Sequence, residues 1–384
     1  MTLFEEHFAD LPDPRLERTR LHALLDILAI ALCAVIAGAD GWDGMADFGR
    51  AKEAWFRRFL RLPNGIPCGD TFRRVFARLE PEAFGRCFTA WMRVLAGSTE
   101  GKLVALDGKT MRHSFDKATG APALHAVSAW VAENRLVLGQ LAVDDDSNEI
   151  PALPNSNEIP ALPKLIGMLD LEGAVVTVDA MGCQVAVAEA VLAAGADYVM
   201  TCKGNQPTMH EEAAAFFEHA GRLPFAFVPH TYDETEDKAH GRSERRRVWC
   251  VDAVGRFPAR HRWPGLRSIA LIERERTAGG ETSVERVHVL TSLATDAKKL
   301  GALVRGHWGI ENQVHWVLDI AFREDECRIR KDHGAANMGL LRKLALNLLK
   351  RETSVKRGIA LKRLQAGWNE EYLEKVLKAG IAEA

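Results

Sequence analysis

The sequence lacks a hydrophobic run long enough to cross a bilayer. Its most apolar run, residues 27–38, is 12 residues long and follows Asp26, whereas a membrane-spanning helix needs about 20 apolar residues. The N-terminus, MTLFEEHFADLPDPR, is acidic and has no cationic start followed by an apolar stretch, so no secretory signal is visible. We therefore expect a cytoplasmic protein that has no membrane partner.

None of the seven cysteines forms a CxxC pair, and their number is odd. A disulfide framework or a thiolate zinc site would need paired spacing. A reduced compartment without a zinc site of this kind is the simpler interpretation.

A complete phosphate-binding loop is also missing. The tripeptide Gly108-Lys109-Thr110 resembles the end of such a loop, but Leu103 stands where the motif needs its first glycine. Leu103 belongs to an apolar strand, so a nucleotide-binding function is set aside.

The chain has almost no net charge, −2 at neutral pH, but its cations are clustered. Residues 50–78 contain eight Arg or Lys against two acids, and residues 322–363 contain twelve against five. Such patches are typical of a protein that grips a polyanion on one face, although a solvated helix face would have the same composition.

Four segments differ in their patterns. Residues 1–98 show helical apolar spacing throughout, and residues 223–293 favour strands. We predict an all-helical domain at 1–98, a mixed core at 99–222, a β-rich insertion at 223–293, and a helix followed by basic helices at 294–384. The core has the order βββαβαβ, with strands at 103–107, 126–131, 136–143, 175–179 and 198–202 and helices near 161–171 and 184–194.

Two of the core strands end in an aspartate. Residues 103–107 read LVALD and residues 175–179 read VVTVD, so strong strand formers precede Asp107 and Asp179. An aspartate at a strand end is often only a turn former, whose side chain bonds to nearby backbone. Three strands, a crossover helix and a parallel strand, however, are the arrangement of an RNase H-like α/β fold, and a right-handed crossover would place the two strands side by side.

A third candidate acid lies on the last core helix, which we expect to begin near Asp296. His307, Glu311, His315 and Asp319 recur every four residues, which predicts one polar stripe with Glu311 in its middle. Asp107, Asp179 and Glu311 together would form an oxygen-only ligand set for two Mg²⁺ or Mn²⁺ ions about 4 Å apart, suited to cleaving or joining phosphodiesters.

A zinc hydrolase that uses His307, Glu311 and His315 is the rival from another enzyme class. It has no HExxH motif, and it leaves both aspartate strands unexplained.

A tandem repeat interrupts the core. SNEIPALPN at 147–155 and SNEIPALPK at 156–164 are identical at eight of nine positions. We interpret this as a duplication within a loop, which costs little because loop closure grows slowly with length. We predict that the second copy packs and leads into the helix at Leu165, while the first bulges outward.

Taken together, these residues resemble the insertion-sequence DDE transposases of the ISAs group, in the branch of H-repeat-associated proteins. The resemblance covers nearly the whole chain and rests on blocks in one order: LPDPR at 11–15, AVIAGADGW at 34–42, LPNGIPCGDTFRRVF at 62–76, LDGKTMRHS at 106–114, VSAW at 127–130, SNEIPALP, VDAMGCQ at 178–184, KGNQPT at 203–208, HGRSERR at 240–246 and HWGIENQVHWVLD at 307–319.

The resemblance implies strand cleavage and strand transfer at insertion-sequence ends, with Asp107, Asp179 and Glu311 as the metal-binding acids. It implies double-stranded DNA, both terminal inverted repeats and target, as the partner, and a homodimer on that DNA in the bacterial cytoplasm, associated with the nucleoid when active. The residues expected to contact DNA are Lys109, Arg112, Lys203, Asn205, Gln206, His240, Arg242, Arg245 and His307. Of the tryptophans, Trp249 and Trp263 are candidates for stacking on a displaced base, whereas Trp308 and Trp316 are expected to pack.

Two features depart from the family pattern. Val304, His307 and Leu318 stand where related transposases carry Tyr, Arg and Lys, so phosphate contacts would come from His307, Arg305 or Arg323. The duplicated nonapeptide leaves open a remnant that binds DNA ends without cleaving them.

Overall fold

The computed structural model describes residues 2–117, 119–143, 158–239 and 241–381. The chain divides into two compact units. The first contains Met1–Ser98, Gly108–Asn157 and Glu311–Ala384, and the second contains Thr99–Asp107 and Glu158–Ile310. Each unit therefore combines segments that lie far apart in the sequence.

The N-terminal part of the first unit is helical over the residues that the structure describes, as predicted. Twelve of the 13 residues of α2 are buried, because the run that is too short for a membrane forms the centre of a helical core. The elements are α1 (Thr2–Phe8), η1 (Glu17–Thr19), α2 (Leu24–Ile36), α3 (Trp42–Ala51), α4 (Glu53–Phe56), α5 (Gly69–Arg78) and α6 (Pro81–Ala96).

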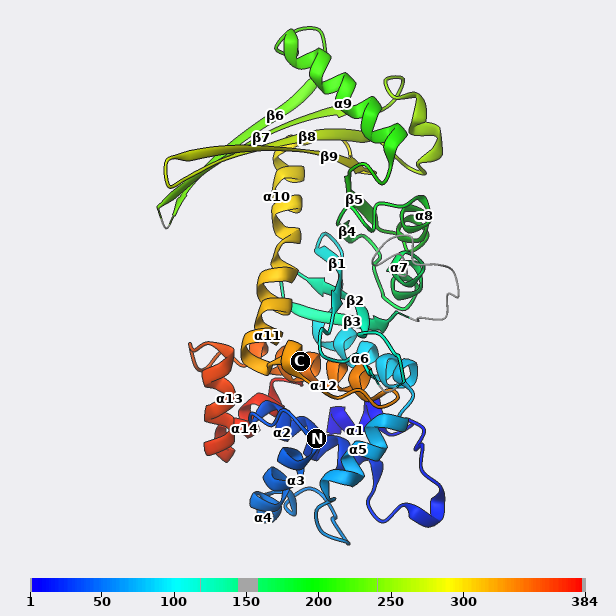
Figure 1. Ribbon diagram of the computed structural model, residues 1–384, viewed down its shortest axis with the longest axis vertical. Helices are drawn as coiled ribbons and strands as arrows, with labels where there is room; N and C mark the ends of the chain where they lie inside the picture. The colour runs from blue at the N-terminus through cyan, green and yellow to red at the C-terminus, as the bar shows by residue number, and fades with distance from the viewer. Residues whose placement is uncertain (1, 118, 144–157, 240, 382–384) are drawn as a thin grey trace. The chain divides into compact units, whose positions relative to one another are not determined.

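A central helix, α12 (Gly334–Arg351), joins these helices to a β hairpin. Fifteen of its 18 residues are buried, and it contacts α2, α5, α6 and strand β3 (Figure 1). The hairpin is made by β2 (His125–Val131) and β3 (Leu136–Ala142), which pair antiparallel. The side-chain amide of Asn347 both donates to and accepts from the backbone of Val137 in β3, so the helix is fixed to the strand.

The C-terminal helices complete the first unit. A short helix, α11 (Trp316–Phe322), contacts α12 and α13. The remaining elements are η4 (Glu324–Glu326), α13 (Ile359–Trp368) and α14 (Glu370–Lys378).

The second unit is built on a twisted sheet with the strand order β1-β4-β5-β9-β8-β7-β6. Strands β1, β4 and β5 are parallel, as predicted from the crossover helices, and β9 then pairs antiparallel with β5. The β-rich segment thus continues the sheet of the second unit. The strands are β1 (Leu103–Thr110, whose last three residues belong to the first unit), β4 (Val175–Val178), β5 (Asp197–Cys202), β6 (His230–Ala239), β7 (Arg242–Asp252), β8 (Ser268–Ala278) and β9 (Glu281–Thr291).

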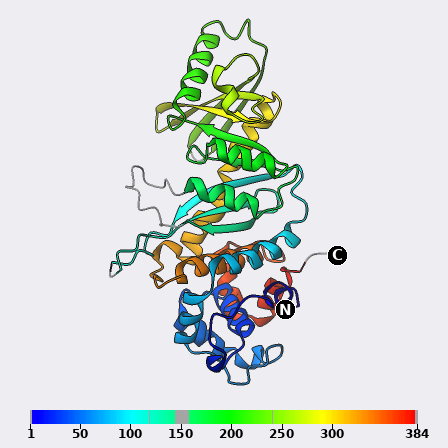
Figure 2. The same cartoon turned by 90° about the vertical axis from the view of Figure 1, so that its right-hand side faces the viewer.

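Helices cover this sheet on both sides. Helices α9 (Pro207–Arg222) and α10 (Ala297–His307) lie on opposite faces of the β6–β9 region (Figures 1 and 2). Asp296 caps α10 as predicted, since its side chain accepts from Lys299 N at 2.9 Å. An apolar cluster that includes Val199, Ile272 and Leu300 fills the space under α10. Helix α8 (Val185–Ala193) packs against β5 and α7.

The second copy of the tandem repeat forms the start of α7 (Glu158–Gly167). Ala161, Leu162 and Leu165 of this helix are buried, in agreement with the prediction that this copy packs and leads into the helix. The first copy, 147–155, lies outside the described residues.

Within the β-rich segment 223–293, the individual strands expected from the sequence are 245–251, 268–274 and 283–290, which lie in β7, β8 and β9; strand β6 is an additional strand. It lies at the edge of the sheet, and most of its side chains are exposed. An edge strand whose two faces are both exposed to solvent has no alternating apolar pattern, and this pattern is the signal that identifies strands in a sequence.

The prediction of one continuous polar stripe through Glu311 and His315 is wrong. Residues Glu311–His315 form a π-helical turn, in which each turn contains more residues than an α-helix. As a result Glu311 is exposed, whereas His315 is only 4% exposed.

Candidate active site

Asp107 and Asp179 occupy matching positions on two adjacent parallel strands. The predicted strand end at Asp107 is wrong, because β1 continues to Thr110, whereas β4 ends at Val178, just before Asp179. Leu106 of β1 pairs with Val178 of β4, so each aspartate is the next residue along its own strand. Parallel neighbours point the same way, and the carboxyl end of such a sheet is where ligand sites form. The strand register therefore places at matching positions two aspartates that are 72 residues apart in the sequence (179 − 107).

Asp179 also acts as a turn former, the structural role that the sequence analysis gave as the alternative to catalysis. Its Oδ1 accepts from the backbone N–H of Gly182 at 3.0 Å. A Cβ on Gly182 would lie 3.0 Å from both Leu162 Cδ1 and Val178 Cβ, so the loop is pressed against α7 and its own strand. This hydrogen bond fixes the orientation of the Asp179 carboxylate.

Asn205 and Gln206, both expected to contact DNA, hold the loop that follows Asp179. The Asn205 side chain donates to Ala180 O at 2.6 Å. Gln206 Nε2 donates to Cys183 O at 2.9 Å and to Gln184 Oε1 at 3.0 Å. In this arrangement both side chains support the backbone that positions Asp179.

His307, another expected DNA contact, lies against β4. Its Nδ1 is 2.9 Å from the hydroxyl oxygen of Thr177, a buried residue two positions before Asp179. The end of α10 is thereby joined to the strand that carries Asp179.

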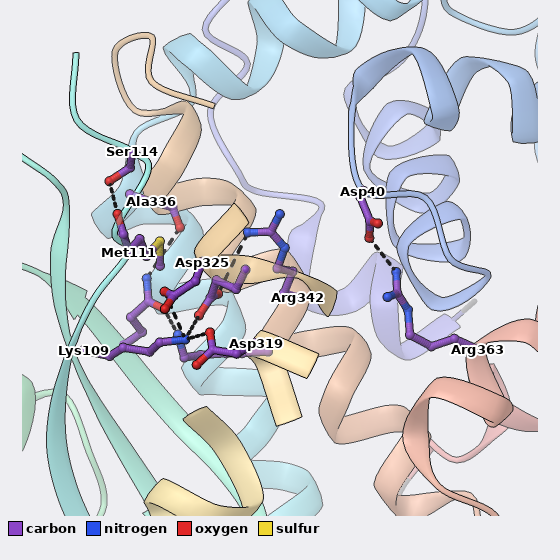
Figure 3. Close-up of polar contacts among 12 residues, drawn as sticks. Asp40, Lys109, Met111, Ser114, Asp319, Asp325, Ala336, Arg342 and Arg363 are labelled. Atoms are coloured by element: carbon purple, nitrogen blue, oxygen red, sulfur yellow. Dashed lines mark hydrogen bonds and ion pairs between the residues drawn. The ribbon is translucent and has the colours of Figure 1, made fainter. Parts of the chain in front are cut away.

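Lys109, two residues beyond Asp107, is held by three acids of the first unit. Its ammonium bonds to the Asp319 carboxylate, lies 3.1 Å from Glu324 Oε2, and is 3.8 Å from Asp325 Oδ1 (Figure 3). The Lys109 side chain is 13% exposed. A phosphate contact from Lys109 would require these ion pairs to open.

The electrostatics of this acid cluster centre on Glu324, which is fully buried. Burial alone would raise its pKa, but the charges of Lys343, Lys109 and Arg342 lower the pKa of Glu324 to about 2. Burial in turn lowers the pKa of Lys343 to about 8. The cluster fixes the end of β1 to the segment that follows α11.

The other cations named from the sequence are more accessible. Arg112 is 78% exposed, and its Nε lies 3.3 Å from Asp325 Oδ2. Arg242 is exposed on β7, and Arg245 is bonded to Glu234 at 2.6 Å. His240 lies outside the described residues.

A groove in the second unit collects cations that the sequence analysis did not single out. It has a volume of about 340 Å³ and lies between α10 and one face of the sheet. Arg246, Arg274 and Lys298 line it beside the expected Lys203 and Arg305. A signal was available for two of them: Arg246 stands two residues before Val248, and Arg274 two residues after Ile272, so each arginine shares a strand face with an apolar residue.

The tryptophans differ from expectation. Trp308 and Trp316, expected to pack, are 54% and 61% exposed. Trp263, considered for base stacking, is 5% exposed and cannot present a face to a base. Trp249 already stacks on Phe225, with ring centroids 5.7 Å apart.

The two aspartates at matching positions of β1 and β4 suit a hard divalent cation. Mg²⁺ and Mn²⁺ prefer carboxylate oxygens, and Asp107 and Asp179 supply these from one edge of the sheet. Among the residues that the structure describes, no group of three His, Cys, Asp or Glu side chains is gathered at metal-binding distance. No described helix is long and apolar enough to span a membrane.

Comparison with known proteins identifies the family. Residues 98–348 match the family model described as transposase DDE domain, and residues 5–92 match the DDE_Tnp_1-associated model. YncI of Escherichia coli O157:H7, named as a transposase, is 36% identical over 97% of this chain and 93% of its own. YhhI of Escherichia coli K12, named as an H repeat-associated transposase, is 34% identical over 97% of both chains.

Two further matches were found. An uncharacterized protein in the dhlA 3′ region of Xanthobacter autotrophicus is 42% identical over 75% of this chain and 94% of its own. A solved piggyBac transposase synaptic complex with hairpin DNA aligns with 98% of this chain and 77% of its own at 9% identity and a TM-score of 0.40, which is too low to support an argument about fold. From the family models and the full-length relatives, the chain belongs to the DDE transposases, in the H-repeat-associated branch of the insertion-sequence enzymes.

Proposed function

We propose that this transposase cuts DNA at insertion-sequence ends and joins the cut strands to target DNA, with Asp107, Asp179 and Glu311 as its catalytic acids. The observation that carries the proposal is the register of β1 and β4, which puts Asp107 and Asp179 at matching positions directly after the last paired residues, Leu106 and Val178. The proposal includes an RNase H-like core, supported by the parallel order β1-β4-β5, with residues 223–293 as an insertion before the Glu311 helix and residues 1–98 as a DNA-binding domain.

The three acids would together hold two divalent ions, Mg²⁺ or Mn²⁺. When bound, such a pair activates the attacking oxygen and stabilises the leaving oxygen of a phosphodiester. The chain's own contribution is to hold the carboxylates in place: Gly182 N fixes Asp179, and the backbone of β1 fixes Asp107 through its pairing with β4.

Contacts to the DNA backbone would come from exposed cations. Arg112, Lys203, Arg242 and Arg245 are accessible, and Lys203 borders the cationic groove. Asn205, Gln206 and His307 are instead proposed to act mainly on the loop and strand that carry Asp179. We propose that two copies assemble on the terminal inverted repeats, in the cytoplasm where the chromosome lies.

The decisive test is cleavage of a labelled duplex that carries a terminal inverted repeat, with Mn²⁺ or Mg²⁺ added after chelation. Asp107→Asn, Asp179→Asn and Glu311→Gln should each lower the cleavage rate by more than about 100-fold, since even the loss of a ligand's supporting group costs 10–100-fold. Glu189→Gln, at an exposed position on α8, is the matched control and should cleave normally. Equal activity of the triad variants and the control would refute the assignment.

The alternatives give different results in the same assay. A DNA-binding remnant would bind the duplex without cutting it, and deletion of residues 147–155 would restore cleavage. A zinc hydrolase would lose as much activity with His315→Ala as with Asp179→Asn. The opposite exposures of Glu311 and His315 do not favour that site.

A further inference from the structure

The turn that begins at Glu311 has an unusual backbone. Residues Glu311–His315 are π-helical and lead directly into α11. A π turn holds an extra residue, so its carbonyls are not bonded as in an α-helix, and such turns occur mostly at functional sites. Return to α-helical geometry would rotate Glu311 relative to α11 by about 100°, the angle that one residue spans.

A lysine of α12 reaches the backbone of this turn. Lys350 of α12 donates from Nζ to the carbonyl oxygen of Gln313 at 2.6 Å. Among the described residues, no carboxylate lies within ion-pair distance of the Lys350 ammonium. Burial, together with the charge of Arg135, lowers the pKa of Lys350 to about 8.

A buried ammonium without an anion is costly to the fold. Lys350 is half-buried; Lys109, also half-buried, and the buried Lys343 and Lys362 each have a carboxylate in contact or close by. Lys350 instead donates to the carbonyl oxygen of Gln313, so this hydrogen bond is what offsets the cost of its charge.

The far end of the same segment is fixed independently. Arg363 donates to Ala321 O, and its guanidinium lies 4.2 Å from the centre of the Phe322 ring. Lys109 bonds to Asp319 in the middle of α11. The contact of Lys350 with Gln313 lies at the other end of this segment, in the π turn.

We infer that Lys350 is a positioning residue for Glu311: its ammonium holds the Gln313 carbonyl and keeps the turn in its wide form, which sets the direction of the Glu311 carboxylate. This inference rests on the proposed function of Glu311 as the third acid. Lys350 itself touches neither DNA nor metal in this scheme.

Lys362 provides a matched control. It is a buried lysine in the same unit that also donates to backbone carbonyls, Leu349 O at 2.9 Å and Glu352 O, but it has no contact with residues 311–315. Replacement of either lysine by methionine removes an ammonium that bonds to backbone carbonyl oxygen and keeps most of the aliphatic volume. Arginine at 350 keeps a donor.

The experiment measures single-turnover cleavage of the terminal duplex, the Mn²⁺ concentration for half-maximal rate, and the affinity for the duplex. Lys350→Met should cut about 10–100-fold more slowly and need more Mn²⁺, as expected when a ligand loses its support, with DNA affinity unchanged within about threefold. Lys350→Arg should recover most of the rate, and Lys362→Met should match the wild type in rate and Mn²⁺ dependence. Normal cleavage by Lys350→Met, or equal losses in the two methionine variants, would overturn the inference.

Hydrogen exchange of the amides of residues 311–318 separates this inference from the proposed function. Lys350→Met should speed exchange there and Lys362→Met should not, whether or not the wild-type protein cleaves DNA. A wild-type protein that fails to cleave would refute the proposed function, while the exchange result still decides the role of Lys350: unchanged exchange in Lys350→Met refutes it.

Discussion

At the scale of single residues, the main finding is that charged side chains near the candidate site form ion pairs with each other. Lys109 and Glu324 were separated by more than 200 residues of sequence, and yet they form one buried ion pair. A charge in such a position is stabilising only while its partners remain, because an unpaired buried charge costs several kcal/mol.

Glu324 gives the clearest test of this point. We expect Glu324→Gln to lower the free energy of unfolding by about 3–5 kcal/mol, because it removes the buried counter-charge of Lys343 and Arg342, while Lys109 keeps its bond to Asp319. Glu326→Gln, at the exposed partner of Arg323, should change it by less than about 1 kcal/mol. Denaturant unfolding of both variants decides between a structural and a negligible role for the pair.

The pH dependence of the same group follows from its low pKa. Glu324 has a pKa of about 2 in the folded chain against an ordinary 4.5, so the unfolded chain binds its proton first as the pH falls. The stabilisation is complete above pH 4.5 and disappears as the pH falls towards 2. The difference in stability between the wild type and Glu324→Gln should therefore shrink on acidification below pH 4.5; a constant difference would contradict the assignment.

At the scale of elements, two loops at the carboxyl edge of the sheet act as one unit. The loop after β5 supplies Asn205 and Gln206, which bond to the loop after β4. Side chains that looked like DNA contacts in the sequence thus connect two βα loops of the sheet.

Asn205 distinguishes support from direct DNA contact. If it acts on the loop, Asn205→Ala should lower the single-turnover cleavage rate by about 10-fold or more and leave the affinity for DNA almost unchanged. If it contacts DNA, the dissociation constant should rise while the rate at saturating protein is retained. Thr208→Ala, at an exposed position of the same segment, serves as control and should change neither quantity.

At the scale of the whole molecule, a net charge of −2 conceals the distribution that matters. The groove in the second unit is bordered by Lys203, Arg246, Arg274, Lys298 and Arg305. Arg246 and Arg305 are paired with Asp237, whereas no acid lies within ion-pair distance of Lys203 or Lys298 among the described residues. These two lysines are the groove cations best able to meet phosphate.

This predicts a change in salt dependence. The double variant Lys203→Gln, Lys298→Gln should weaken DNA binding and reduce the slope of log affinity against log salt concentration by roughly 1–2, since each phosphate contact contributes about 0.9. Lys375→Gln with Lys378→Gln, on the exposed face of α14, removes the same charge elsewhere and should leave the slope unchanged. Fluorescence anisotropy between about 50 and 200 mM salt measures both.

The sequence alone determined the elements whose patterns are local. The strands before Asp107 and Asp179, their parallel order, the capping by Asp296 and the helical N-terminal segment follow from strand formers, crossover length and apolar spacing. The family blocks also identified the three acids as candidates.

Only the tertiary structure decided where the polar side chains are directed. The sequence could not show that Lys109 is enclosed by three acids, that Asn205 bonds to a neighbouring loop, or that Lys350 reaches the turn at Glu311, because these partners come from other elements. Nor could it show the π turn, since one extra residue in a helical turn leaves composition and apolar spacing unchanged. Local patterns determine which elements form, whereas the direction of each charge depends on burial and on partners that are distant in sequence.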